Sequence, residues 1–269
     1  MTSSIEITPF FERTSNTVQY VVSCLKTNAC AVIDPVMDWK EDERKTATIT
    51  PDALCLFIRD RGYRLEWILE THVHADHVSA AHYIQKKLGG QIAIGEKVKD
   101  IQKTAGFTTG DEVDHFDVYF KERDTFSIGD ISVIVMETPG HTPACISYYI
   151  EDQMIFVGDT IFMPDQGTAR CDFPSGSVHD MWSSIQKILS LPSHVKVYTC
   201  HDYQPGGREP SWESTVAIQR EKNIHVKEGT EKESFVEIRT ARDKTLSAPK
   251  MMKVAVPANL APRTFHSQN

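Results

Sequence analysis

The sequence predicts an α/β protein built from layers of sheet and helix. Short apolar or alternating segments that are typical of strands recur along the chain, and amphipathic segments typical of helices lie between them. This order is typical of a layered α/β/α sandwich. The length of 269 residues is within the range of one large α/β core. We therefore expect a single domain over residues 1–269, in which the residues after about 226 form a C-terminal extension.

The first half of the chain alternates predicted strands and helices. A strand pair is expected at 18–24 and 30–34, strands at 65–69 and 91–94, and helices at 78–88 and 96–103. Thr50 and Pro51 indicate the start of another helix, because threonine is a good N-cap and proline is tolerated in the first turn. We expect loops in the charged segment 40–50 and in the acidic segment 106–121, the latter over the functional site or at its rim.

The second half contains the clearest helix, at 174–191. Its apolar side chains form one stripe, and Ser177 with Asp180 is expected to cap its start. A hairpin is expected at 125–130, strands at 131–137, 146–150, 154–157 and 195–199, and a further helix at 231–246. We expect the strand at 195–199 to be the last of the core and the proline-rich tail from residue 248 to be partly extended.

Composition excludes several classes of function. The net charge is −8 and no Lys/Arg-rich block occurs, which argues against nucleic-acid binding. No segment approaches the roughly 18 apolar residues of a membrane span, and the N-terminus lacks the order of a secretory signal. Six cysteines occur without a Cys-x-x-Cys pair, which favours reduced thiols. We expect a cytoplasmic protein, or a mitochondrial matrix protein if the source is eukaryotic.

Three histidines and one aspartate lie close together after the predicted strand at 65–69. They are His72, His74, Asp76 and His77. A strand that leads into a tight turn would cluster these side chains at its C-terminal end. Histidine is the commonest metal ligand, and carboxylate is its usual companion for harder cations. A solvated turn that is rich in histidine by chance is the alternative, but the number of fixed positions disfavours it.

Three further predicted strands end in a potential metal ligand. His141 follows the strand at 131–137 in a turn formed by proline and glycine, Asp159 follows 154–157, and His201 follows 195–199. Each one alone is explained by a capped loop or a buried histidine. Four strands that all end this way predict a metal site.

The seven side chains allow two arrangements. In the first, His72, His74 and His141 hold one metal. Asp76, His77 and His201 then hold a second, and Asp159 bridges the pair, which suits hydrolysis by a shared water between ions about 3.5–4 Å apart. In the second, only His72, His141 and Asp159 bind, as in non-haem Fe(II) oxygenases. The other four would then orient the ligands and set their protonation. The ligand types leave both arrangements open.

These motifs resemble those of a known family. His-x-His-x-Asp-His after a strand is similar to the signature of the metallo-β-lactamase superfamily. Three segments resemble its persulfide dioxygenase branch: the His-Thr-Pro-x-Cys turn at 141–145, the Arg-x-Asp-Phe segment at 170–173 and the His-Asp-Tyr turn at 201–203. The segment 206–210 resembles the bacterial β-lactamase-like-hydrolase subgroup, which is related to glyoxalase II. The resemblance covers roughly residues 17–223.

The resemblance implies a four-layer αββα sandwich of the metallo-β-lactamase type. It also implies one Fe(II) per chain, held by His72, His141 and Asp159, and oxidation of glutathione persulfide with O₂ to sulfite and glutathione. Arg170 and Tyr203 would contact the substrate, with Arg208 near them. Asp34 and Asp202 would orient metal ligands.

Some roles have simpler alternatives. Arg170 has an ordinary alternative as a structural ion pair. Cys171 could act as a thiol relay, but it is expected, like Cys145 and Cys200, to be buried and inert.

Two other functions remain open. One is a glyoxalase II-like thioester hydrolase with two zinc or iron ions, and the other is a non-catalytic sensor of metal or persulfide. No rhodanese-type domain is expected in this chain, so a sulfurtransferase partner would be a separate protein. We expect a homodimer, and neither a nucleic-acid nor a membrane partner.

Overall fold

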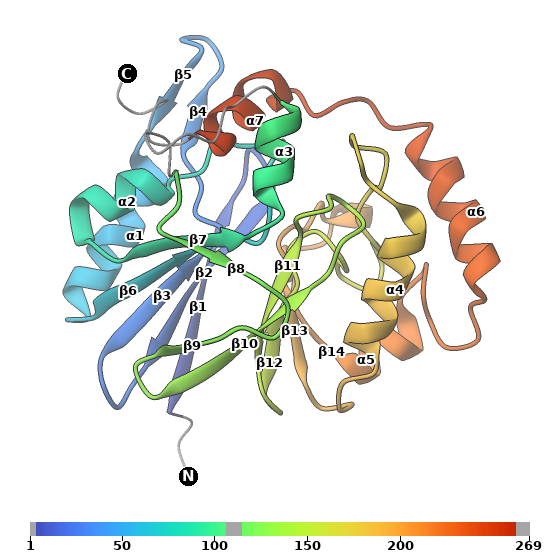
Figure 1. The fold of residues 1–269 in the computed structure, drawn as a ribbon, viewed down its shortest axis with the longest axis horizontal. Helices are drawn as coiled ribbons and strands as arrows, with labels where there is room; N and C mark the ends of the chain where they lie inside the picture. Colours follow the sequence, from blue (N-terminus) through green and yellow to red (C-terminus); the bar gives the residue numbers. More distant parts are fainter. Residues whose placement is uncertain (1–3, 106–114, 262–269) are drawn as a thin grey trace. The chain divides into compact units, whose positions relative to one another are not determined.

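The computed structural model describes residues 4–105 and 115–261. The chain divides into two compact units. Figure 1 shows the helices and strands of both, coloured along the sequence. The first unit comprises Met1–Phe120, Phe126–Ser132 and Ala248–Asn269, and the second comprises Lys121–Thr125 and Val133–Ser247. The single domain over residues 1–269 stays a prediction. Helix α7 of the presumed C-terminal extension belongs to the first unit, whereas α6 belongs to the second.

The first unit contains a six-stranded sheet in the order β1-β2-β3-β6-β7-β8. Its strands are β1 (Ile5–Glu12), β2 (Thr17–Cys24), β3 (Ala29–Ile33), β6 (Arg64–Leu69), β7 (Gln91–Gly95) and β8 (Val118–Phe120). Strands β3, β6, β7 and β8 run parallel. Ile33 is paired with Leu69, so β3 and β6 end side by side. The predicted strands at 18–24, 30–34, 65–69 and 91–94 are confirmed.

Helices α1 (Ile49–Asp60), α2 (Ala81–Leu88), α3 (Val98–Thr104) and α7 (Met252–Leu260) complete this unit, with a hairpin of β4 (Asp38–Lys40) and β5 (Lys45–Ala47). Three predictions were wrong here. The segment 40–50 is not all loop, since it contains β5. The tail after 248 contains α7. Residues 118–120 of the expected loop form β8, while 106–114 lie outside the described residues.

The expected N-cap of α1 was also wrong. The cap position is Thr48, which makes no side-chain cap bond. Thr50 lies in the first turn, where its amide and hydroxyl both donate to the Asp38 carboxylate at 2.8 and 2.5 Å. A carboxylate from a neighbouring strand thus satisfies the helix start, and sequence spacing does not reveal that contact.

The second sheet has the order β14-β13-β12-β11-β10-β9. Its strands are β9 (Thr125–Ile128), β10 (Ile131–Glu137), β11 (Ile146–Ile150), β12 (Met154–Phe156), β13 (Lys196–Tyr198) and β14 (Glu213–Thr215). The chain passes between the two units in β9 and β10. The strands predicted between 131 and 199 are confirmed, but β14 adds a strand beyond the one expected to be last.

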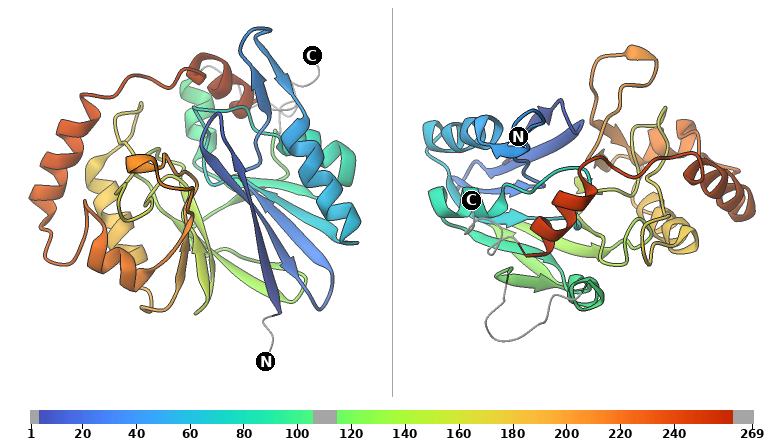
Figure 2. Two further views of the ribbon diagram at one scale, coloured as in Figure 1. Left: turned by 180° about the vertical axis from the view of Figure 1, so that it is seen from behind. Right: turned by 90° about the horizontal axis from the view of Figure 1, so that it is seen from above.

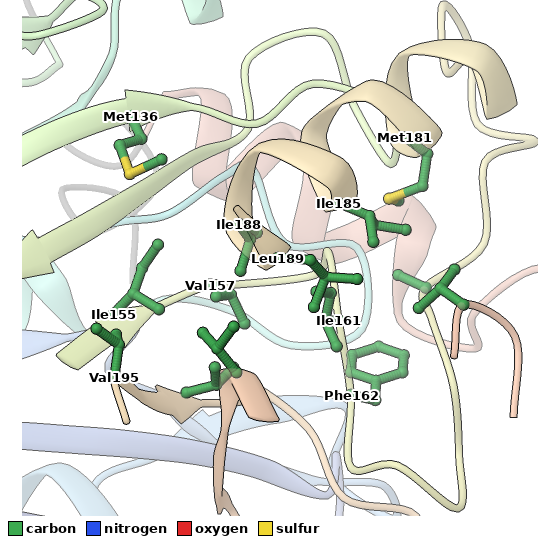
Figure 3. Close-up of a cluster of buried hydrophobic side chains, with 14 of the residues drawn as sticks. Met136, Ile155, Val157, Ile161, Phe162, Met181, Ile185, Ile188, Leu189 and Val195 are labelled. Atoms are coloured by element: carbon green, nitrogen blue, oxygen red, sulfur yellow. The ribbon is translucent and has the colours of Figure 1, made fainter. Parts of the chain in front are cut away.

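Helices α4 (Val178–Leu189), α5 (Val216–Lys222) and α6 (Lys232–Asp243), with the short helix η1 (Pro205–Gly207), accompany this sheet. Helix α4 buries one apolar stripe, including Met181, Ile185 and Ile188, among residues of β12 and the segment after it (Figure 3). Each such side chain contributes about 1.5–3 kcal/mol when it is fully buried. Helix α6 lies beside α4 (Figure 2). Its Phe235 contacts Trp182, with ring centroids 5.4 Å apart.

Among the described helices, none combines the length and the apolar content that crossing a lipid bilayer requires. All six cysteines are buried.

The start of α4 provides a test of the sequence-based assignment. The Ser177 hydroxyl accepts a hydrogen bond from the Asp180 amide at 3.1 Å, so the predicted cap is confirmed. Ser177→Ala should lower the free energy of unfolding by about 0.5–2 kcal/mol, measured by urea denaturation. Ser183→Ala on the same helix removes an exposed hydroxyl that bonds only the His179 carbonyl. It should change stability by under about 0.5 kcal/mol, and equal losses in both variants would contradict the capping role.

Candidate metal centre

The loop after β6 buries its three histidines. His72, His74 and His77 are 1%, 0% and 3% exposed, which is unusual for polar side chains in a loop. The ring centroids of His72 and His74 lie 4.1 Å apart, and those of His74 and His77 lie 4.2 Å apart. Donor atoms of His74, Asp76 and His77 all lie within 4.8 Å of one another. The first unit therefore brings the loop donors of the predicted site together.

Asp34 organises this cluster from the end of β3. It is 2% exposed and has a positive φ of 50°, a conformation that aspartate tolerates better than most residues. Its carboxylate accepts hydrogen bonds from the Thr71 amide at 2.8 Å and the Thr71 hydroxyl at 2.9 Å. The His74 Nε2 lies 3.1 Å from Asp34 Oδ1. Three donors from the loop after β6 thus converge on one carboxylate because β3 and β6 end side by side.

These bonds fix which nitrogen of each ring would face a metal. The Thr71 hydroxyl donates to Asp34, so its oxygen accepts from Nδ1–H of His72 at 3.0 Å. Nε2 is then the metal-side nitrogen of His72. In His74 the bond from Nε2 to Asp34 makes Nδ1 the metal-side atom. His74 Nδ1 is buried and has no hydrogen-bond partner among the described residues, as expected of a nitrogen that would bind a cation.

A second carboxylate, Glu70, was not anticipated from the sequence. It is 3% exposed, and its Oε2 lies 3.3 Å from His74 Nε2. Burial lowers the pKa of His74, but the attraction of Asp34 and Glu70 outweighs it and places that pKa well above its usual value. Burial likewise favours protonated Asp34, yet His74 and the Thr71 donors hold the Asp34 pKa below its usual value. For Glu70 burial prevails and the pKa is raised. A metal bound at His74 must therefore displace a proton.

His77 and Asp76 form the other end of the loop. The His77 Nδ1 lies 3.2 Å from Asp76 Oδ2 and 3.4 Å from the Thr17 hydroxyl. Nε2 is therefore the metal-side atom of His77, and it too is buried without a hydrogen-bond partner in the described parts of the chain. Asp76 orients His77 in this geometry, and its carboxylate keeps further oxygen lone pairs with which it can bind a metal. Both arrangements of the predicted site accommodate these contacts.

The second unit brings the other three donors to one edge of its sheet. β10 and β12 run in the same direction, because each is antiparallel to β11, and β12 is parallel to β13. The segments that follow these three strands carry His141, Asp159 and His201. Asp159 lies between the two histidines: Oδ2 is 3.5 Å from His141 Nε2, and Oδ1 is 3.4 Å from His201 Nε2. One oxygen therefore faces each imidazole, a geometry compatible with a terminal or a bridging carboxylate.

His141 is held by the backbone of the segment after β12. Its Nδ1 donates to the Arg170 carbonyl at 2.8 Å, which leaves Nε2 as the nitrogen toward Asp159. Its ring packs edge-on against Phe173, with centroids 4.9 Å apart. The preceding residue must be glycine, because a Cβ on Gly140 would lie 2.4 Å from the Met181 Cα of α4. The predicted turn at His141 is thus shaped by close contact with a helix.

Helix α6 fixes the backbone on both sides of Arg170. The buried pair Arg239 and Asp243, 2.7 Å apart, lies on this helix. Arg239 Nη1 donates to the Thr168 carbonyl at 2.8 Å, and Asp243 accepts from the Cys171 amide at 2.9 Å. The Arg170 carbonyl that orients His141 therefore lies between two residues whose backbone groups are hydrogen-bonded to side chains of α6. No sequence pattern after residue 226 indicates this role.

Arg170 and Tyr203, which are predicted to bind the substrate, lie in the second unit, and three guanidinium donors of Arg170 are already hydrogen-bonded to protein groups. Arg170 makes a two-pronged contact with Asp172 at 2.6 and 2.7 Å, and its Nη1 donates to the Ser247 carbonyl. Tyr203 is 51% exposed and stacks on His201 with centroids 5.6 Å apart. Their proposed roles toward a substrate stay predictions.

Asp202 and Arg208 pair with each other rather than with a histidine. The closest contact is 2.6 Å, and Arg208 also binds Asp165. Asp202 additionally accepts from the Ser211 amide at 2.6 Å. These partners lie in the loop after His201, and the role of Asp202 in orienting a metal ligand stays a prediction.

Cys171 does not have the environment of a reactive thiol. It is 7% exposed, and burial raises its pKa, as does the nearby Asp243 carboxylate. A thiolate is therefore disfavoured at this position.

Asp34→Asn should weaken metal binding about 10–100-fold, because the amide cannot accept from all three donors and the two rings lose their fixed tautomers. Chelator competition with Zn²⁺ or Co²⁺ measures this change. Asp38→Asn is the matched control, since Asp38 accepts two comparable bonds but only from Thr50. If Asp34→Asn and Asp38→Asn bound metal with the affinity of the unmodified chain, Asp34 would be merely a turn residue.

Comparison with known proteins identifies the family. The profile described as the metallo-beta-lactamase superfamily matches residues 14–201. The Dictyostelium discoideum protein named glyoxylase B2 is 44% identical over 97% of this chain and 91% of its own length. A beta-lactamase hydrolase-like protein of Xylella fastidiosa is 45% identical over 94% of this chain, which spans 60% of that protein. The mitochondrial persulfide dioxygenase ETHE1 of Mus musculus is 26% identical over 93% of this chain and 85% of its own length.

Solved structures agree on the fold. The crystal structure of ETHE1 from Myxococcus xanthus matches with a TM-score of 0.77 and 24% identity, over 96% of this chain and 99% of that one. A metallo-beta-lactamase from Staphylococcus aureus matches with a TM-score of 0.75 and 20% identity, over 97% of this chain and 73% of that one. The predicted α/β class with two sheets and helices is confirmed, as is the resemblance to persulfide dioxygenases and hydrolase-like proteins. The chain belongs to the metallo-β-lactamase superfamily, whose fold implies a bound metal.

Proposed function

We propose that this protein is an Fe(II)-dependent persulfide dioxygenase that oxidises glutathione persulfide with O₂ to sulfite and glutathione. The observation that carries the proposal is the similarity to persulfide dioxygenases over 93% of the chain, combined with the motif segments at 141–145, 170–173 and 201–203. These segments include His141 and its carbonyl partner Arg170, and His201 with Tyr203 stacked on it.

We propose that His72, His141 and Asp159 together hold one iron per chain. Two neutral imidazoles and one carboxylate form the ligand set of many non-haem Fe(II) oxygenases. Hydrogen bonds to both rings favour the neutral imidazoles. In His72 and in His141 the proton is on Nδ1, which donates it, so Nε2 keeps a lone pair with which it can bind a metal. His74, Asp76, His77 and His201 would then be neighbours that orient the ligands and set the local charge.

The reaction balances without any further reductant. Oxidation of the terminal persulfide sulfur to sulfite removes four electrons, which is the number that one O₂ accepts. Glutathione persulfide, O₂ and one water give glutathione, sulfite and two protons. Bound Fe(II) would supply adjacent open positions for the persulfide sulfur and for O₂. The chain would bind the glutathione part and keep His72 and His141 deprotonated at their metal-side nitrogens.

We propose that Arg170 and Tyr203, with Arg208 nearby, contact the carboxylates of the glutathione part. The protein is acidic overall, so attraction of an anionic substrate requires local cations. Asp172 and Ser247 take three of the five guanidinium donors of Arg170. The Asp172 contact also fixes the plane of the guanidinium, which favours directional binding of a second carboxylate.

A thioester hydrolase with two zinc or iron ions is the second candidate. Its support is that relatives 44% and 45% identical are named glyoxylase B2 and beta-lactamase hydrolase-like protein. The position of Asp159, with one oxygen toward each of two histidines, suits a bridging ligand as well. A non-catalytic sensor would bind metal but would turn over neither substrate.

In the cell, we propose a cytoplasmic homodimer, or a mitochondrial matrix protein if the source is eukaryotic, supplied with persulfide by a separate rhodanese-type sulfurtransferase.

Metal content and oxygen uptake separate these functions. Protein from iron-replete cells, purified anaerobically, should contain one iron per chain and consume O₂ when given glutathione persulfide. His72→Ala, His141→Ala and Asp159→Ala should each lose the iron and the oxygen uptake, because each removes a ligand. Two tightly held metals per chain, with hydrolysis of a glutathione thioester and no oxygen uptake, would overturn the proposal.

His77→Ala and His201→Ala are the matched variants for this experiment. Both remove a buried imidazole, His77 from the loop after β6 that also carries His72 and His201 from the segment after β13, so they control for general damage. As neighbours of the ligands they should retain most of the iron while losing activity. Loss of half the metal would instead identify them as ligands of a second ion.

Arg170→Lys should raise the KM for glutathione persulfide and leave the iron content unchanged. Lysine keeps the charge but lacks the planar pair of donors. Losing one charge-assisted hydrogen bond costs roughly 1.5–3 kcal/mol, hence about tenfold or more in kcat/KM. Arg242→Lys, an exposed arginine of α6 that bonds Thr245, is the control. Unchanged kinetics in Arg170→Lys and Tyr203→Phe would place the glutathione elsewhere.

A further inference from the structure

The C-terminal helix α7 contacts the backbone of two proposed metal-site histidines. Asn259, near the end of α7, is 6% exposed. Its Nδ2 donates to the His74 carbonyl at 2.9 Å and to the His77 carbonyl at 2.8 Å. Its Oδ1 accepts from the Ser79 amide at 2.8 Å. One side chain that is 180 to 185 positions away in the sequence therefore holds both ends of the loop segment 74–79.

The orientation of this amide is determined by its partners. Both hydrogens of Nδ2 point at carbonyl oxygens, and Oδ1 faces an N–H. The reverse orientation would place an oxygen against two carbonyls and an NH₂ against an amide donor. The loop lies between β6 and α2 and has no strand or helix ladder of its own at these carbonyls. Buried carbonyls need hydrogen-bond donors, and Asn259 supplies the donors that the N–H groups of a helix or strand would otherwise supply.

The same contact continues to the imidazole of His74. The Ser79 hydroxyl donates to Glu70 Oε1, and Glu70 Oε2 lies 3.3 Å from His74 Nε2. Starting from Asn259, a closed circuit thus runs through the Ser79 backbone, its hydroxyl, Glu70 and the His74 ring. It returns to Asn259 through the His74 carbonyl. The ring and the backbone of His74 are therefore in contact with one connected set of polar side chains.

Helix α7 itself is firmly attached to the first unit. Gln102 of α3 donates from Nε2 to the Leu260 carbonyl at 2.7 Å. Ala255, Ala258 and Leu260 are at most 2% exposed. Asn259 therefore projects from a fixed support, which is what a group that positions a metal loop requires.

We propose that Asn259 is a positioning residue for the metal centre, acting through the backbone of His74 and His77. The segment 252–260 would then be part of the metal-binding apparatus. This inference rests on the proposed metal site but not on which reaction the site catalyses. Its thermodynamic consequence is reciprocal: if α7 stabilises the metal-binding form of the loop, metal must stabilise the docked form of α7.

Asn259→Leu tests this role, since leucine has a similar shape and carries neither a hydrogen-bond donor nor an acceptor. The variant should bind Co²⁺ about tenfold or more weakly in chelator competition. It should also change the visible absorption of the bound Co²⁺, which reports ligand geometry. Gln102→Met is the matched control: it removes the other amide that ties α7, but contacts no metal-site residue. It should lower the Tm of the metal-free protein while changing Co²⁺ affinity by less than about threefold.

A second measurement needs no variant and remains informative if Asn259→Leu does not fold. Zn²⁺ added to the unmodified protein should slow amide hydrogen exchange in both 70–79 and 252–260, while α1 stays unchanged as an internal reference. Protection of the loop without α7, or equal Co²⁺ affinity and spectrum in Asn259→Leu and the unmodified protein, would overturn the proposal. Failure of the unmodified protein to bind either metal would instead refute the proposed metal site.

Discussion

A buried carboxylate that is not a proposed metal ligand sets the geometry of the first donor cluster. Asp34 is almost fully enclosed, so an ionised oxygen there is tolerated only with strong donors around it. Thr71 and His74 supply those donors, and each bond also fixes a proton on the neighbouring ring or hydroxyl. The tautomers of His72 and His74 follow from this requirement. The arrangement exists only because β3 and β6 are parallel and end at the same register.

In the second unit, a backbone carbonyl rather than a carboxylate orients a candidate ligand histidine. His141 is oriented by the carbonyl of Arg170, and that carbonyl lies between two residues bound to the Arg239–Asp243 pair of α6. A buried ion pair is weak support for overall stability, because desolvation offsets much of its attraction. Here its charges are used to bind peptide groups and so to fix a loop. In each unit, therefore, a segment after residue 226 stabilises a loop that carries candidate ligands.

The donor set is compatible with both a one-metal oxygenase and a two-metal hydrolase. Imidazole nitrogens and carboxylate oxygens serve Fe(II) and Zn²⁺ alike, and a shared fold does not choose between reactions. Arg170, Tyr203 and Arg208, for which we propose substrate contacts, lie at or near the surface of the second unit, and a glutathione-type substrate is common to both candidate reactions. For this reason metal stoichiometry and oxygen uptake are more informative than any further geometry of the histidines.

The sequence by itself determined most strands of the two sheets, the main helices and the candidate ligands. Local spacing carries this information: a period of two or 3.6 residues and a His or Asp directly after a strand are visible without any tertiary contact. Tertiary structure decided what lies far apart in the sequence. The start of α1 is satisfied by the carboxylate of Asp38 and not by a Thr50 cap, and α7 lies within the proline-rich tail that was expected to be partly extended. Glu70, Arg239 and Asn259 hold the ligand loops through contacts to buried carbonyls, amides and imidazoles. No local sequence pattern predicts such contacts, because the packing of whole helices and strands determines which groups lie next to a buried polar side chain.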